Sequence, residues 1–178
     1  MGGYVALLRA INVGGAGKLP MADLRAICGE LGFTEVETYI ASGNVIFTSS
    51  GSAASVKVKL EARLQDYAGK PVGVVVRSAE EMTALLEANP FRTAEPNKTY
   101  VMFLDAPPPQ DALETARGRV DEDMRLGKQE IYIVYPNGMG RSKLSVPAAK
   151  AGTARNLNTV AALVEILSVT PVLPIPEG

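Results

Sequence analysis

The sequence predicts an α/β protein of the α+β type, built from two ferredoxin-like βαββαβ subdomains. Three observations support this prediction. The length of 178 residues fits one large domain or two small ones. Leu, Ile, Val and Phe make up 47 of these residues, far above the roughly 20% below which chains fail to build a hydrophobic core. Segments typical of strands and helices follow the order strand, helix, strand, strand, helix, strand, and most of that order occurs twice without a detectable sequence repeat.

The first expected strand covers residues 4–9, where the sequence YVALLR is apolar up to its last residue. A loop over residues 12–20 that is rich in glycine leads from this strand into a helix. Gly32 is a suitable C-terminal cap for that helix. The apolar residues of the helix recur at helical spacing and define one buried face: Leu24, Ile27, Cys28 and Leu31.

Two segments with β-branched and aromatic residues, 36–40 and 44–48, are separated by three residues and predict a hairpin. A second helix is expected over residues 53–67. The apolar run GVVVR at 73–77 predicts a further buried strand. These elements complete the order of one ferredoxin-like unit.

The second half begins with a well-marked helix start. Ser78 can cap the helix, and Glu81 stands at the spacing of a capping box. We expect Met82 and Leu85 on its buried face and the Asn89-Pro90 pair at its end. The next strand is expected at 98–104.

Further elements follow a run of three prolines. They are a short polar helix over 111–117, a hairpin of strands 124–126 and 130–135, a helix at about 156–167 and a last strand at 169–173. We expect the first subdomain to cover residues 1–80 and the second residues 81–178, as one compact unit. The alternative is one mixed sheet with helices on one face.

The composition excludes several classes of function. The chain has no His and one Cys, so it cannot by itself form a Ser-His or Cys-His dyad, an internal disulfide or a thiolate metal cage. We expect neither a metal nor a cofactor. Any binding or catalysis must be built from Arg, Lys, Asn and Ser side chains, and the sequence alone favours neither an enzyme nor a binding protein.

The sequence gives no sign of export or membrane insertion. Residues 1–4 lack the basic stretch of a secretory signal, and no apolar run approaches the roughly 20 residues that span a bilayer. We therefore expect a cytoplasmic protein that does not enter membranes. The net charge of −1 gives no overall attraction to nucleic acid.

The loop after the first strand contains Arg9, Asn12 and Lys18 beside several glycines. It is not a Walker A loop, because that motif needs Gly at position 12 and Ser or Thr at position 19. A tight turn that requires positive φ explains the glycines more simply. The functional alternative is a loop that contacts an anion.

Three further segments place polar residues at turns or at a helix start. Ser42-Gly43-Asn44 forms the expected hairpin turn, and Gly140-Arg141-Ser142-Lys143 follows a glycine loop. Ser142 and Lys143 are neighbours on an extended chain and point to opposite faces, which argues against a catalytic dyad. In Thr153-Ala154-Arg155-Asn156, Asn156 suits an N-cap, and a helix N-terminus beside Arg155 favours an anion.

The charges are unevenly distributed along the chain. Residues 1–22 contain Arg9 and Lys18 and no acidic residue, and residues 131–164 contain four basic residues and no acidic one. The rest of the chain carries the other 12 basic residues together with all 19 acidic residues. The basic residues coincide with glycine turns and a helix start, where backbone N–H groups are also free. This coincidence indicates a surface that faces an anion.

Several of these motifs occur together in a known family. The segments Leu8-Arg9-Ala10-Ile11-Asn12-Val13-Gly14-Gly15, Ser42-Gly43-Asn44-Val45-Ile46-Phe47, Asn89-Pro90-Phe91, Ser142-Lys143-Leu144 and Thr153-Ala154-Arg155-Asn156 resemble the bacterial family called domain of unknown function 1697 (DUF1697). The resemblance runs from Tyr4 to about Leu167. It implies two ferredoxin-like subdomains and no established activity. The family usually has Gly at the position of Ala10 and an aromatic residue at the position of Leu157, so a pocket shaped by those residues would be altered.

These observations lead to one main hypothesis and two alternatives. The main hypothesis is a site for a small phosphorylated or nucleotide-like anion, with Arg and Lys neutralising its charge and Asn and Ser orienting it. The alternatives are binding of RNA or another single-stranded nucleic acid, and an interaction module without a small ligand. No oligomeric state is predicted. The residues expected to bind the anion are Arg9, Asn12, Lys18, Ser42, Asn44, Lys143, Arg155 and Asn156.

Overall fold

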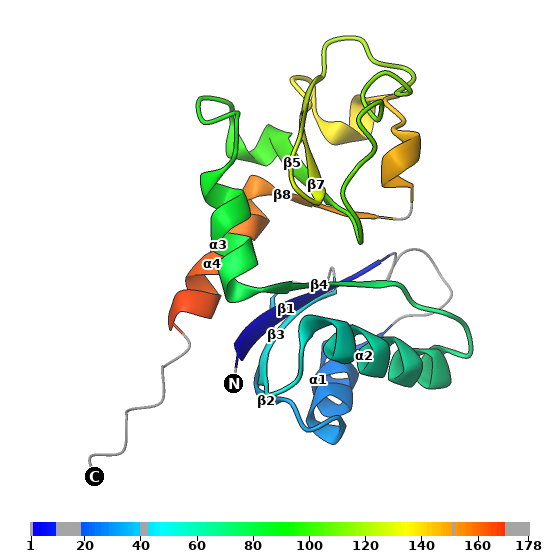
Figure 1. The fold of residues 1–178 in the computed structure, drawn as a ribbon, viewed down its shortest axis with the longest axis vertical. Coiled ribbons are helices and arrows are strands. Elements are labelled where there is room, and N and C mark those ends of the chain that lie inside the picture. Colours follow the sequence, from blue (N-terminus) through cyan, green and yellow to red (C-terminus); the bar gives the residue numbers. More distant parts are fainter. Residues whose placement is uncertain (1, 10–18, 40–42, 151, 170–178) are drawn as a thin grey trace. The chain divides into compact units, whose positions relative to one another are not determined.

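The structure, a computed structural model, describes residues 2–9, 19–39, 43–150 and 152–169 (Figure 1). It contains two four-stranded antiparallel sheets, so the alternative of one mixed sheet is wrong. The chain divides into two compact units. The first unit comprises residues 1–81 and 162–178, and the second comprises residues 82–161.

The first unit has the βαββαβ order that the sequence predicts. Its sheet has the strand order β2-β3-β1-β4, and every pair of neighbours is antiparallel, which is the arrangement of a ferredoxin-like fold. The elements are β1 (Gly2–Leu8), α1 (Met21–Glu30), β2 (Thr34–Tyr39), β3 (Asn44–Ser49), α2 (Ala53–Ala68) and β4 (Val74–Ser78).

Both helices of this unit lie on the same side of its sheet (Figure 1). The α1 face predicted from helical spacing is the buried face, and Val56, Leu60 and Leu64 of α2 face the same core. Phe33 stacks on Phe47 of β3 at the centre of this core, with ring centroids 4.4 Å apart. The periodicity of the sequence therefore located the core of this unit correctly.

The ends of α1 and α2 have the capping residues that their sequences indicate. Gly32 adopts a φ of +87° after α1, and the Phe33 N–H donates to the Cys28 carbonyl, as in a Schellman motif. The Ser52 hydroxyl accepts a hydrogen bond from the Ser55 N–H at the start of α2.

Helix α3 (Ala79–Glu87) begins with the capping box that was predicted. The Glu81 N–H donates to the Ser78 hydroxyl over 3.1 Å, and the Ser78 N–H donates to the Glu81 carboxylate over 3.0 Å. The helix ends before Asn89, whose side-chain oxygen accepts the Phe91 N–H. The boundary between the two units falls inside α3, between Glu81 and Met82.

The second unit repeats the strand order of the first with different connections. Its sheet has the order β6-β7-β5-β8, again antiparallel throughout. In the described part, the segments that join its strands contain turns, short 3-10 helices and an isolated bridge in place of two long helices. Its strands are β5 (Thr99–Phe103), β6 (Asp123–Leu126), β7 (Glu130–Val134) and β8 (Thr153–Asn156). Helix α4 (Leu157–Val169) follows, and its residues 162–169 belong to the first unit.

Three elements of the second half need comment. The helix predicted over 111–117 is wrong, because residues 110–115 form turns and Ala112 is the one fully buried residue in that segment. A short segment with so little apolar surface gains too little from packing to offset helix nucleation. Strand β8 was not predicted. The strand expected at 169–173 begins at the last residue of α4, and residues 170–173 lie outside the described part.

None of the helices described by the structure has both the length and the apolar composition needed to cross a membrane.

Candidate functional site

Two cavities of similar size lie in the second unit. The first, here the Glu122 cavity, has a volume of about 460 Å³ and is lined by residues 118–122 together with residues from Tyr135 to Lys143. The second, here the Lys150 cavity, has a volume of about 470 Å³ and is lined by residues of the sheet and of the segment 144–150. Tyr135 lines both of them.

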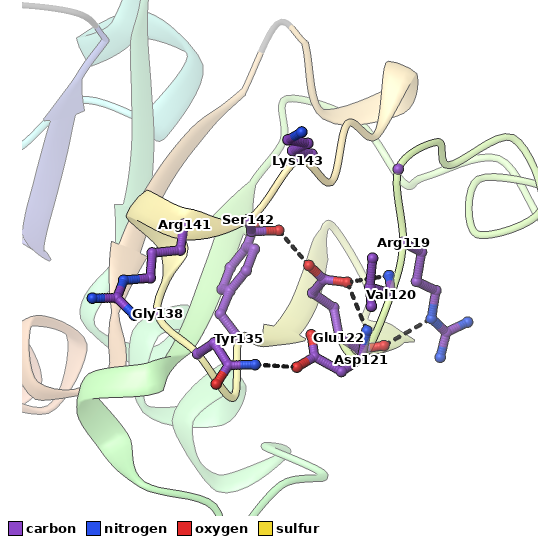
Figure 2. A pocket seen from close by; sticks show the side chains of 11 residues that line it. Arg119, Val120, Asp121, Glu122, Tyr135, Gly138, Arg141, Ser142 and Lys143 are labelled. Atoms are coloured by element: carbon purple, nitrogen blue, oxygen red, sulfur yellow. Dashed lines mark hydrogen bonds between the residues drawn. The ribbon is translucent and has the colours of Figure 1, made fainter.

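The Glu122 carboxylate is buried at the wall of the first cavity and joins two segments of the chain (Figure 2). One of its oxygens accepts the N–H groups of Val120 and Asp121 over 2.7 and 3.2 Å, and the other accepts the Ser142 hydroxyl. These hydrogen bonds, that of Ser142 first, lower the pKa of Glu122 to about 2. Glu122 is therefore ionised at neutral pH, and its oxygens are held by donors within the protein.

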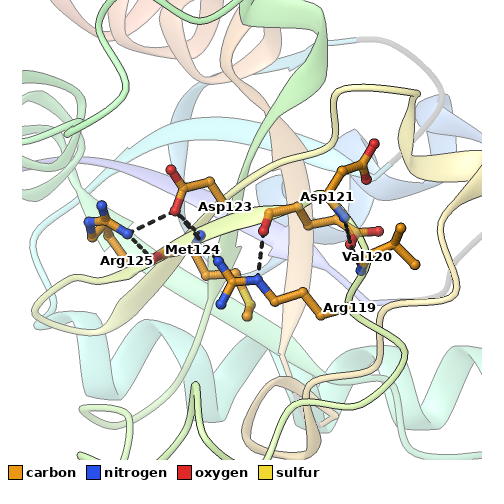
Figure 3. Close-up of polar contacts among 7 residues, drawn as sticks. Arg119, Val120, Asp121, Asp123, Met124 and Arg125 are labelled. Atoms are coloured by element: carbon orange, nitrogen blue, oxygen red, sulfur yellow. Dashed lines mark hydrogen bonds and ion pairs between the residues drawn. The ribbon is translucent and has the colours of Figure 1, made fainter.

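The neighbouring acidic residues are also engaged within the protein, Asp121 in Figure 2 and Asp123 in Figure 3. Asp121 accepts a hydrogen bond from the Asn137 side chain, and Asp123 lies 2.8 Å from a guanidinium nitrogen of Arg125. Arg119 donates to the Glu122 backbone carbonyl over 2.7 Å. Nowhere in the described ranges do three or more His, Cys, Asp or Glu side chains come together in a way that could hold a metal ion.

Arg141 and Lys143 border the Glu122 cavity as exposed cations. Neither forms an ion pair with any residue that the structure describes. Figure 2 shows the Arg141 side chain directed away from the Glu122 carboxylate. The ionised side chains of the cavity lining carry a net charge of +1, from three basic and two acidic residues.

The Tyr135 side chain is buried between the two cavities and packs edge-on against Tyr100, with ring centroids 5.4 Å apart. Burial, together with the charge of Glu122 and the proximity of Tyr100, raises the pKa of Tyr135 to about 12. No described residue forms a hydrogen bond with its hydroxyl, although every fully shielded side-chain N or O atom in the described part has a partner. The Tyr135 hydroxyl is therefore a neutral donor that a solvent molecule or ligand can reach.

A short β-bridge joins two segments that line the cavities. Arg117 and Ser145 exchange two backbone hydrogen bonds of 2.8 Å each, and the next residue, Gly118, has a φ of +73°. A Cβ atom at Gly118 would lie 2.2 Å from the Lys143 carbonyl oxygen, so only glycine fits there. This contact holds the segments 117–122 and 142–145 together.

The predicted anion-binding residues of the first unit fall into two groups. Asn12, Lys18 and Ser42 lie outside the described residues. Arg9 is exposed directly after β1, and Asn44 is buried at the start of the adjacent strand β3, where its side-chain amide donates to the Tyr39 carbonyl over 3.0 Å. Because Leu7 pairs with Asn44, the structure brings Arg9 and Asn44 to the same end of the first sheet.

The predicted residues of the second unit have different surroundings. Lys143 lines the Glu122 cavity. The Arg155 guanidinium is buried on β8 and donates to Thr153 and to the Ala154 carbonyl over 2.8 Å each, and burial lowers its pKa to about 10. The Asn156 side-chain oxygen accepts the Thr159 N–H over 2.9 Å and caps α4, as predicted. Arg155 and Asn156 line neither of the two cavities.

Glu122, Tyr135, Arg117 and Arg119 border the cavities and were not predicted as site residues. Glu122 stands between two aspartates in the sequence, which resembles a solvated turn, so the sequence gives no sign that it is buried. Arg141 did leave a signal, because it belongs to the acid-free segment 131–164.

Comparisons with known proteins place the chain in a family. A family model described as "Protein of unknown function (DUF1697)" matches residues 1–132. A solved structure, "The structure of conserved bacterial protein SP0830 from Streptococcus pneumoniae", is similar with a TM-score of 0.79 and 30% sequence identity, over 93% of this chain and 98% of that one. No curated protein matches the chain. The match over most of the chain and the agreement in fold show that the protein belongs to the DUF1697 family.

Proposed function

We propose that the second unit binds a small phosphorylated or nucleotide-like anion in the Glu122 cavity. One observation supports this above all. Arg141 and Lys143 border a cavity of about 460 Å³ without forming an ion pair in the described part, while the carboxylates of the same cavity are held by internal hydrogen-bond donors. The cations are therefore available to a ligand, and the acids are not.

The geometry suits a phosphorylated ligand better than a metal ion or a neutral solute. A guanidinium presents donors in a planar fork that matches phosphate oxygens, and an ammonium adds a compact positive charge. The cavity volume lies in the range of about 300–1,000 Å³ that small-molecule sites occupy. Val120, at the cavity edge, is 88% exposed and offers an apolar surface beside the cations, as a sugar or base would require.

Of the residues predicted from the sequence, Lys143 lines this cavity. Arg141 and Arg119 were not predicted as site residues, but they also line the cavity and are part of the proposed site. The predicted contribution of the first unit stays a prediction, which variants at Arg9 and Lys18 would test in the same assay. Arg155 and Asn156 are assigned to folding, because their side chains are used by β8 and α4.

The test is thermal stability of the full chain against inorganic phosphate, AMP and glucose 6-phosphate. A ligand at 100 times its dissociation constant should raise the free energy of unfolding by about 2.7 kcal/mol. We expect Arg141→Gln and Lys143→Gln each to weaken binding by about tenfold, the loss of one charge-assisted hydrogen bond. Lys128→Gln removes the same charge from the exposed turn between β6 and β7 and should leave binding unchanged. Equal loss in all three variants, or no stabilisation by any ligand, would refute the proposal.

Two outcomes of this test would favour the alternatives. A salt-dependent shift with single-stranded RNA that both cavity variants abolish would indicate nucleic acid. The described sheets offer little for base stacking, because Phe47 and Tyr132 are buried and Tyr4 donates its hydroxyl to the Gly51 carbonyl. No response to phosphates or RNA would favour an interaction module.

A further inference from the structure

We infer that the Lys150 cavity is a second and separate binding site, and that it takes a small organic acid with an apolar body and one carboxylate. Two properties of the cavity support this inference. Its floor is part of the hydrophobic core of the second unit, and its lining contains basic side chains but no acidic ones.

The floor favours an apolar body. Ile133, Tyr135 and Ala149 belong to the buried core of this unit and line the cavity from below. Met102, Leu144 and Val146 pack against that core and extend the apolar lining. Met102, Leu144 and Val146 are partly exposed, so a hydrocarbon or aromatic group placed on them would displace water from apolar side chains, which is the usual driving force for binding in a preformed cavity.

The rim favours a carboxylate. Arg117 and Lys150 contribute the two positive charges, and Ser145 adds a hydroxyl. The backbone of Arg117 is fixed by its two hydrogen bonds to Ser145, and the 3-10 turn Pro147–Ala149 fixes the backbone before Lys150. A guanidinium carried by this fixed backbone can bind both oxygens of a carboxylate, which would leave the apolar end of the acid for the apolar lining.

The two cavities have different linings. Tyr135 is the one residue that lines both, whereas Arg117 and Ser145 line the Lys150 cavity and Gly118 and Lys143 line the Glu122 cavity. The inference therefore does not rest on the proposed function of the Glu122 cavity. The two proposals also differ in probe and in residues, so either can fail alone.

The experiment uses the full chain, labelled with ¹³C at Ile, Leu and Val methyl groups, and octanoate as the probe. We expect octanoate to shift the methyl signals of Ile133, Leu144 and Val146 in a saturable way, while those of Leu60 and Val56 in the first unit stay in place. Octanol has the same apolar body without the charge, and acetate has the charge without the body. Each should bind at least about tenfold more weakly than octanoate, since each lacks one of the two interactions.

Matched variants assign the charge contact. Arg117→Gln should weaken octanoate binding by about tenfold or more, and Lys128→Gln, on the exposed turn between β6 and β7, should leave it unchanged. Ala149→Leu fills the floor and should abolish the shifts, with unchanged methyl signals of Val101, buried on β5 of the second unit and outside the cavity, as the folding control. The inference is overturned if octanoate leaves the Ile133 methyl in place, if octanol binds as tightly as octanoate, or if Arg117→Gln binds octanoate like the unchanged protein.

Discussion

The two units share one strand order but cover their sheets in different ways. In the first unit, α1 and α2 pack on one face of the sheet. In the second, turns and short 3-10 segments from 104–122 and 135–150 occupy the corresponding connections and supply Ala112, Leu144 and Ala149 to the core. A helix satisfies its own backbone, whereas an irregular segment needs other partners. Glu122 is such a partner, because its carboxylate accepts two backbone N–H groups. Both cavities described above, which polar groups line, lie in this second unit, where irregular segments cover the sheet.

Equivalent positions in the two sheets carry similar residues. Val5 on β1 pairs with Arg77 on β4, and Val101 on β5 pairs with Arg155 on β8. Both arginines are buried, and each donates to the carbonyl of the residue before it. The residue after each arginine, Ser78 or Asn156, caps the following helix. The similarity is confined to short segments, which is why the sequence shows no repeat.

The largest expected effect tests the helix-covered core of the first unit. Phe47 is about 1% exposed and stacks on Phe33. Phe47→Ala should lower the free energy of unfolding by about 3–5 kcal/mol, measured by urea denaturation. Val58→Ala, at an exposed position of α2, should change it by less than about 0.5 kcal/mol. Similar losses at the two positions would contradict the described core.

A pair of glycines compares a crowded loop of the second unit with an open helix end of the first. Gly118 and Gly69 have φ values of +73° and +72°, so Ala carries the same backbone cost of about 1–2 kcal/mol at each. Only Gly118 would also place its Cβ against a backbone oxygen, 2.2 Å away. Gly118→Ala should therefore destabilise by about 1–3 kcal/mol more than Gly69→Ala in the same assay. Equal losses would show that the segments 117–122 and 142–145 do not touch as described.

Glu122 tests whether a carboxylate holds the loops of the second unit together. Glu122→Gln should cost about 1.5–3 kcal/mol near pH 7, the range for hydrogen bonds to a charged group. The folded pKa of about 2 lies below the ordinary value of 4.5, so this stabilisation is present above about pH 4.5 and is lost as the pH falls toward about 2. Urea denaturation over this range should show the gap between the two proteins closing on acidification. Glu114→Gln, at an exposed site nearby, should show a small and constant difference, and a gap at Glu122 that widens in acid would contradict the assignment.

The smallest expected effect tests the equivalence of the two helix caps. Ser78→Ala and Asn156→Ala should each lower the free energy of unfolding by about 1 kcal/mol, because each removes one side-chain acceptor from a helix start. Ser50→Ala, at an exposed position outside a helix, serves as the reference in the same thermal or urea measurement. If the free energy of unfolding fell in one variant and not in the other, Ser78 and Asn156 would not have equivalent capping roles at the starts of α3 and α4.

Sequence periodicity predicted the first unit well because long amphipathic helices with capping residues leave a strong signal. The second unit was harder to predict for physical reasons. Strand β8 has four residues, and the position that pairs with Val101 carries Arg155 in place of an apolar residue, so the strand pattern is hidden. The segment 111–117 contains helix-forming residues but too little apolar surface to pack as a helix.

The candidate site was predicted only in part. Basic residues in an acid-free segment pointed to the loop that contains Arg141 and Lys143. The roles of Glu122 and Tyr135 depend on contacts between residues about 20 positions apart, which no local pattern encodes. Arg155 is predicted to bind an anion because it precedes a helix, and this stays a prediction; its guanidinium is buried on an edge strand and has backbone and hydroxyl partners there, which the sequence did not indicate.

The path of the chain has a consequence for synthesis. The first unit contains residues 1–81 and 162–178, so the entire second unit is inserted between its two parts. Near the start of β1, the Leu167 side chain of α4 lies against Gly3. A ribosome delivers the N-terminal part first and the closing part last, with about 80 residues made in between. The unit that begins first therefore completes its contacts last, and the second unit can fold while the first still waits for the end of α4.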